Sequence, residues 1–110
     1  MIQLQKAPYF IADFEIQYEW YFSEVGEDTA EGYLNAVNDT LQFLRQNPAL
    51  GRERRFRNPR LKGMRSFRAS PPFNQHAIFY RFDASALFAE RVIHGARDLP
   101  RRLLQSPGTD

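Results

Sequence analysis

The stretch from Asp28 to Pro48 reads DTAEGYLNAVNDTLQFLRQNP, and it contains the clearest structural signal in the sequence. Its apolar side chains recur every three or four positions, which is the spacing of one face of an α-helix. These positions are Ala30, Tyr33, Leu34, Val37, Leu41 and Leu44. Asp28 and Glu31 are spaced as a capping box at the N-terminus. Asn47 ends the helix, because a residue before proline avoids the helical region.

The preceding segment predicts another helix, from Pro8 to near Gly26. Proline suits the first turn of a helix, where its missing N–H leaves no hydrogen bond unmade. Apolar residues then follow at three- and four-residue steps, at Ile11, Phe14, Tyr18, Tyr21 and Val25. Because few residues separate the two helices, we expect them to form an antiparallel hairpin. Ile2 to Gln5 alternates apolar and polar residues and predicts a short strand before the hairpin.

The chain changes character after Gly51. The segment from Arg52 to Lys62 is basic and has no clear period, which indicates a surface loop. Strands with short connections follow at Met64–Ser70, Ala77–Phe82 and Ala86–Ile93, with a tight turn at Asp83–Ser85 and a last helical turn at Leu99–Leu104. The sequence therefore predicts one α+β domain over residues 1–110. Its N-terminal antiparallel helix hairpin packs on a small antiparallel β-sheet of three to four strands.

Charge is distributed unevenly along the chain, although the net charge is only +2. Residues 1–50 contain two basic and eight acidic residues, whereas residues 51–110 contain thirteen basic and five acidic ones. Between Arg52 and Arg68, eight lysines or arginines accompany a single acid, Glu53. A surface of one sign attracts anionic partners, either nucleic acid or an acidic protein. The alternative is a basic surface that serves only solubility.

Composition excludes several classes of protein. The chain has no cysteine, which excludes disulfides and thiolate metal sites. Its two histidines, without clustered carboxylates, predict neither a metal site nor a cofactor. No apolar run approaches the roughly 20 residues of a membrane helix, and there is no glycine-rich phosphate loop or nucleophile motif. We expect a cytoplasmic protein without a metal, a cofactor or a membrane partner.

Four stretches carry a resemblance to a known family. They are Leu44–Gly51 at the close of the second helix, Asn58–Arg65 at the entry to the first long strand, Ile78–Phe82 in the central strand and Arg91–Leu99 in the final strand and its exit. In this order, after a helix hairpin, they resemble the toxins of the RelE/ParE superfamily, which belong to bacterial type II toxin–antitoxin systems. The last stretch is most similar to ParE-like members. The resemblance implies an antitoxin as protein partner.

The resemblance leaves three functions open. ParE-like members inhibit DNA gyrase by binding, without catalytic residues of their own, and this interpretation is favoured. RelE-like members cleave mRNA on the ribosome, with basic residues around the scissile phosphate. The candidates for that role here are Arg65, Arg68, Arg81, His94 and Arg97. Ala77 and Leu103 argue against cleavage, because RelE-type enzymes tend to carry an arginine and an aromatic residue there. The third function is that of a non-toxic binding module.

The resemblance also implies an antitoxin with an acidic, amphipathic segment that folds on binding. The candidate residues for binding the antitoxin or the target are Arg52, Arg54, Arg55, Arg57, Arg60, Lys62, Arg65, Arg68 and Arg97. The alternative role of Arg97 is an ion pair with Asp98. The alternative role of His94 is that of a hydrogen-bonding residue at the end of a strand. His76 is interpreted as a loop residue. Trp20 lies off the apolar stripe of its helix and is a candidate partner contact.

Overall fold

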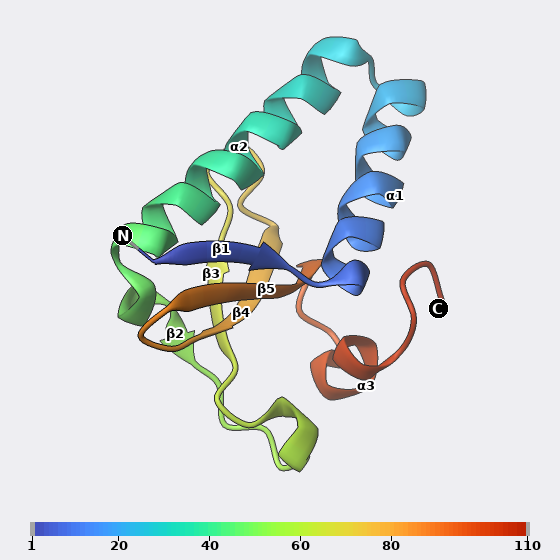
Figure 1. Ribbon diagram of the computed structural model, residues 1–110. Coiled ribbons are helices and arrows are strands. Elements are labelled where there is room, and N and C mark those ends of the chain that lie inside the picture. Colours follow the sequence, from blue (N-terminus) through green and yellow to red (C-terminus); the bar gives the residue numbers. More distant parts are fainter. Residues whose placement is uncertain (1, 110) are drawn as a thin grey trace.

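A mixed β-sheet organises residues 2–109, the part of the chain that this computed structural model describes (Figure 1). In spatial order, its five strands within that range are β1 (Gln3–Lys6), β5 (Ala86–His94), β4 (His76–Phe82), β3 (Arg65–Arg68) and β2 (Arg52–Glu53). Helices α1 (Pro8–Glu24) and α2 (Glu27–Gln46) form a hairpin over one face, and α3 (Leu99–Leu104) packs on the other. Two 3-10 turns, η1 (Pro48–Leu50) and η2 (Pro59–Leu61), lie on either side of β2 in the chain. No helix within residues 2–109 is long and apolar enough to cross a bilayer.

Both predicted helices are present, and the hairpin they form is confirmed. The predicted stripe of α2 is largely buried, and its most shielded side chains are Tyr33, Val37, Leu41 and Leu44. The predicted capping box is wrong, because α2 begins at Glu27 with Gly26 as its N-cap, at a φ of 142° that side chains rarely allow. Asp28 lies instead in the first turn, where its negative charge interacts favourably with the helix dipole. In α1 the buried stripe is narrower than predicted, since Ile11 and Val25 are exposed.

The sheet differs from the prediction at both edges. β3, β4 and β5 pair in antiparallel fashion as predicted. The short strand predicted at Ile2–Gln5 is present as β1, but it pairs in parallel with β5, with Gln3 opposite Ala86. In addition, β2 forms a two-residue strand in the segment predicted as a loop. Neither pairing can be predicted from the local sequence. The partner of β1 lies near the far end of the chain, and β2 is too short to show a hydrophobic period.

Each face of the sheet packs against a separate hydrophobic core. Ile78 and Tyr80 of β4 face the hairpin and pack against α1 and α2. The buried residues of the opposite core are Leu61, Met64, Phe79, Ile93, Leu99 and Leu103. Because α3 has only six residues, it covers just part of this second face. The uncovered part, beside β2 and β3, contains a cavity.

A bulge in β5 sets the direction of Arg91. Ala89 and Arg91 pair with consecutive residues of β4, so Glu90 is an extra residue without a partner. Past the bulge, the Nη1 of Arg91 donates to three backbone carbonyls at the end of α3, at 2.8 to 3.1 Å. Its Nε and Nη2 form a bidentate pair with Asp13 of α1, at 2.7 and 2.8 Å. One buried guanidinium therefore connects α1, β5 and α3.

Removing the carboxylate of this pair is expected to destabilise the whole domain. The side chains of Arg91 and Asp13 are 5% and 8% exposed. Asp13→Ala leaves the guanidinium buried without its anion, and breaking a buried pair in this way costs about 3–5 kcal/mol. Urea unfolding followed by circular dichroism measures the loss.

The matched control breaks an exposed pair. The side chains of Arg101 and Asp98 are 57% and 69% exposed. Arg101→Ala should therefore lower the free energy of unfolding by no more than about 1 kcal/mol. Equal and small losses in the two variants would contradict a central role for the buried pair.

Candidate functional site

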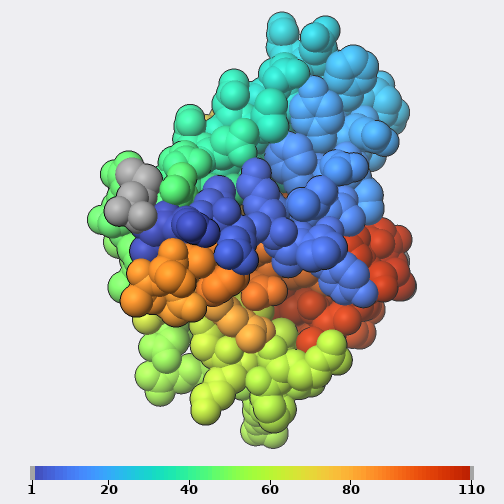
Figure 2. All heavy atoms as spheres, in the orientation of Figure 1, coloured from blue at the N-terminus to red at the C-terminus, as the bar shows by residue number. Residues whose placement is uncertain are grey.

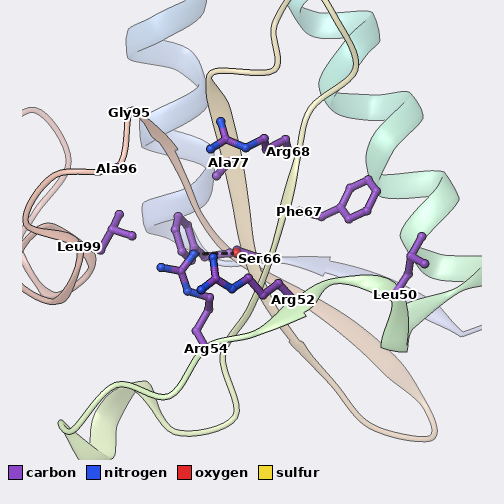
Figure 3. A pocket seen from close by; sticks show the side chains of 11 residues that line it. Leu50, Arg52, Arg54, Ser66, Phe67, Arg68, Ala77, Gly95, Ala96 and Leu99 are labelled. Atoms are coloured by element: carbon purple, nitrogen blue, oxygen red, sulfur yellow. Dashed lines mark hydrogen bonds between the residues drawn. The ribbon is translucent and has the colours of Figure 1, made fainter.

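A concave cavity of about 390 Å³ opens on the sheet face opposite the hairpin, beside β2 and β3 (Figure 3). Strand register brings its floor together, since Ser66 and Arg68 of β3 lie opposite Phe79 and Ala77 of β4. Residues two apart on a strand share a face, so all four side chains point into the same space. The residues that complete the lining include Leu50, Arg52, Arg54, Gly95, Ala96 and Leu99.

Arg54 is held in the cavity by contacts from three directions. Its backbone N–H donates to the Met64 carbonyl at 2.8 Å, which fixes the segment after β2 beside β3. Its Nη1 donates to Ser66 Oγ at 3.2 Å. Its guanidinium lies 5.5 Å from the centre of the Phe56 ring and 6.0 Å from that of Phe79, within the range of cation–π attraction. Ser66 and Phe79 were missed by sequence reasoning, because strand register is needed to place them beside an arginine.

The electrostatics of the cavity favour an anionic ligand. Burial, followed by the nearby charges of Arg52 and Arg68, lowers the pKa of Arg54. Ion pairs within residues 2–109 join Arg91 to Asp13 and Arg101 to Asp98, so no carboxylate of the described chain neutralises the three cavity arginines. An incoming oxyanion would receive charge-assisted hydrogen bonds from them.

The predicted binding residues fall into separate groups. Those that line the cavity are Arg52, Arg54 and Arg68. Those exposed on the surrounding loop are Arg55, Arg57, Arg60 and Lys62, and Arg97 is exposed between β5 and α3. Arg65 differs from all of these, because its Nη1 donates to the carbonyls of Ala49 and Gly51 at 3.1 and 2.8 Å. It fixes the turn after α2 and does not line the cavity.

The candidate nuclease residues are not brought together. Arg65 and Arg68 leave β3 on opposite faces. Arg81 donates to a backbone carbonyl of the basic loop beside a different cavity. His94 lies at the end of β5 with its ring against His76. Within this set, Arg68 lines the basic cavity.

His76 is not the loop residue that the sequence indicates. It begins β4, is 2% exposed, and its Nε2 lies 2.8 Å from the Tyr21 hydroxyl. Burial, and to a smaller extent the neighbouring His94, lowers the pKa of His76 to about 4. Burial also raises the pKa of Tyr21. Near neutral pH, a protonated Tyr21 hydroxyl and a neutral imidazole therefore share this hydrogen bond.

Three other positions have structural outcomes. Asp98 pairs with Arg101 at 3.4 Å, and no Arg97–Asp98 pair is present in residues 2–109. Leu103 is buried in the second core, whereas Ala77 lines the cavity. Within residues 2–109, no three or more His, Asp or Glu side chains are grouped so as to hold a metal ion.

A helix hairpin over one face of a mixed sheet, with a basic cavity on the other face, defines a small domain of the α+β class. Residues 4–99 match the model of the family described as ParE toxin of type II toxin-antitoxin system, parDE. The chain belongs to this ParE toxin family. The predicted family and fold class are thus confirmed.

Solved structures with a similar fold include the following one. It is described as the chromosomal ParDE TA system from P. aeruginosa, and its chain is 18% identical, with a TM-score of 0.69 over 87% of this chain and 98% of that chain. A comparison with curated protein sequences found no match.

His76 is expected to make stability depend on pH on the acid side. Its folded pKa of about 4 lies below the ordinary value of 6.5, so the folded state gives up a proton that the unfolded state binds. The stability linked to neutral His76 is complete above about pH 6.5 and is lost as pH falls toward 4. The total loss is on the order of 3 kcal/mol.

His76→Gln tests this, because the amide can still form a hydrogen bond with Tyr21 but does not titrate. Urea unfolding at about pH 7.5 and pH 4.5 brackets the relevant range. The difference between the two pH values should be smaller in the variant than in the wild type, since the carboxylates are the same in both. An identical pH dependence would show that His76 does not contribute.

Proposed function

We propose that this chain is a toxin that inhibits DNA gyrase and that a cognate antitoxin neutralises it. One observation carries the antitoxin part of the proposal: Arg52, Arg54 and Arg68 meet in one cavity without a carboxylate partner in residues 2–109. An acidic segment relieves the repulsion among these like charges as it binds. Membership in the ParE toxin family supports a bacterial toxin–antitoxin setting.

The lining of the cavity supports an amphipathic segment over a purely acidic one. Leu50, Phe79 and Leu99 provide apolar walls beside the arginines. A segment that combines carboxylates with apolar side chains satisfies both parts of the surface. Such a segment would be disordered when unbound and would become ordered on the toxin. The reason is that an isolated acidic segment buries too little apolar area to fold alone.

The arrangement of titratable groups supports inhibition by binding. A general acid or base must lie within hydrogen-bond reach of the reacting atoms. Ala77 contributes no titratable group to the cavity, and the buried Leu103 does not line it. Inhibition of gyrase requires no such groups in the toxin, which favours it over mRNA cleavage.

Reversing the cavity charges should weaken antitoxin binding through faster dissociation. Arg52→Glu/Arg68→Glu replaces two cations of the cavity with anions, which repel the acidic segment of the antitoxin. The dissociation rate of the antitoxin should therefore rise at least about tenfold. Arg55→Glu/Arg57→Glu makes the same charge change on the exposed loop outside the cavity. That control should mainly slow association. Surface plasmon resonance against the immobilised antitoxin, at about 50 and 500 mM salt, separates the two rates.

Two results would contradict this assignment. Equal dissociation rates in the two variants would place the acidic segment elsewhere. A wild-type association rate that does not change between the two salt concentrations would exclude electrostatic steering by the basic segment.

The gyrase proposal predicts that purified toxin at micromolar concentration inhibits supercoiling and that added antitoxin restores it. Refolded, monodisperse toxin is the correct sample, because aggregates inhibit unspecifically. Primer extension on mRNA from expressing cells should show no codon-phased cleavage. Supercoiling that continues unchanged would remove gyrase as the target, and phased cleavage would assign the chain to the RelE-like activity instead.

A further inference from the structure

An apolar groove runs along the outer side of α1 and shares no lining residue with the basic cavity. It has a volume of about 610 Å³ and is lined by Ile16, Gln17, Trp20, Tyr21, Val25 and His94. Ile16, Trp20 and Val25 are 50%, 52% and 58% exposed. Large apolar side chains gathered at a surface in this way mark a place where another molecule binds.

The C-terminal segment covers only the first half of this helix face. Tyr9, Asp13, Ile16 and Trp20 are spaced by three or four residues and so lie along one face of α1. Tyr9 contacts Ser106 at 3.2 Å, and Asp13 binds the arginine that holds the end of α3. Trp20, nearly two turns beyond Asp13, remains half exposed. The groove therefore lies on the second half of this α1 face, which the C-terminal segment leaves uncovered.

The hairpin beside the groove carries charge of one sign. From Pro8 to Leu44 the hairpin contains no lysine, arginine or histidine. Its acidic residues are Asp13, Glu15, Glu19, Glu24, Glu27, Asp28, Glu31 and Asp39. Asp13 is paired within the fold, and Glu24 is exposed one turn beyond Trp20. The hairpin side of the groove is therefore negative and attracts a basic partner, whereas Arg102 approaches the opposite side through the His94 carbonyl.

We propose that this groove binds a basic surface of the protein on which the toxin acts, with Trp20 seated in an apolar recess of that surface. The inference rests on the proposed function, because it takes the chain to be a toxin with a protein target. Tryptophan is among the residues that most often dominate the binding energy of an interface. The surrounding carboxylates select partners of opposite charge and exclude acidic ones.

Two other occupants fit less well. The antitoxin segment proposed for the cavity is acidic, so the hairpin would repel it. A second copy would have to bring its basic cavity to the groove, and such head-to-tail contacts build rings or open filaments rather than a simple two-fold dimer. The tip of the hairpin and the basic loop of residues 54–62 also lie at opposite ends of the molecule (Figure 2). A target on the groove and an antitoxin in the cavity therefore contact different residues, although His94 of the groove directly precedes Gly95 of the cavity.

The test compares two matched double variants. Trp20→Ser/Glu24→Lys removes the aromatic side chain and places a positive charge toward a basic partner. Phe43→Ser/Asp39→Lys makes closely similar changes at exposed positions four residues apart on α2, outside the groove. Each variant is assayed for gyrase inhibition, for growth arrest on expression and for antitoxin affinity. Thermal unfolding checks that both fold, and Glu24→Lys alone provides a groove variant with its packing intact.

The expected result is selective. The groove variant should require at least about tenfold more toxin for half-inhibition of gyrase and should fail to arrest growth. Its antitoxin affinity should stay within about twofold of the wild type, because neither Trp20 nor Glu24 lines the cavity. The α2 control should match the wild type in all three measurements.

Other results overturn the inference in distinguishable ways. Full gyrase inhibition by the groove variants would exclude the groove as the binding site for the target, while gyrase would remain the target. Weakened antitoxin binding would assign the groove to the antitoxin. If the wild type does not inhibit gyrase, the proposed target is lost and growth arrest decides: arrest lost only in groove variants supports the groove for another protein. Unchanged arrest, or no arrest by the wild type, overturns it.

Discussion

The buried ion pair between Asp13 and Arg91 is the interaction on which the arrangement of the other elements depends. β1 pairs with β5 only as far as Ala89. Beyond that point the Asp13 carboxylate accepts the backbone N–H of Val92 at 3.2 Å, and so continues the edge of the sheet where the strand has ended. Each nitrogen of the Arg91 guanidinium has an acceptor. This satisfies the condition under which a charge can be buried.

The same pair reaches the basic cavity through α3. Arg91 binds the backbone carbonyls at the C-terminal end of this helix, and Arg102 binds those of His94 and Arg97 before it, at 2.8 and 3.3 Å. Leu99, the first residue of α3, forms one wall of the cavity. A carboxylate of α1 therefore helps to position one wall of the cavity.

Sequence reasoning succeeded where a pattern is local and failed where the partner is distant. The long apolar stripe of α2 and the alternation in β4 predicted those elements, because each pattern repeats within its own segment. His76 was predicted to lie in a loop, because Pro71 and Pro72 precede it. Its pairing with His94 instead makes it the first residue of a buried strand. The basic stretch predicted an anionic site, but its residues do not show which arginines turn inward. That choice depends on register, which places Arg68 on the cavity face and Arg65 on the other.

The fold converts an uneven charge distribution along the chain into two separate surfaces. The acidic half of the sequence forms the helix hairpin, and the basic half forms the sheet face and loops opposite it (Figure 1). The small net charge conceals this separation, because the two halves nearly cancel. Two partners of opposite charge can then bind without sharing residues. With the antitoxin in the cavity and the target on α1, neutralisation would not act by direct competition for one site. It would act through the bulk of the bound antitoxin, or through α3 and Arg91, which physically join the two surfaces.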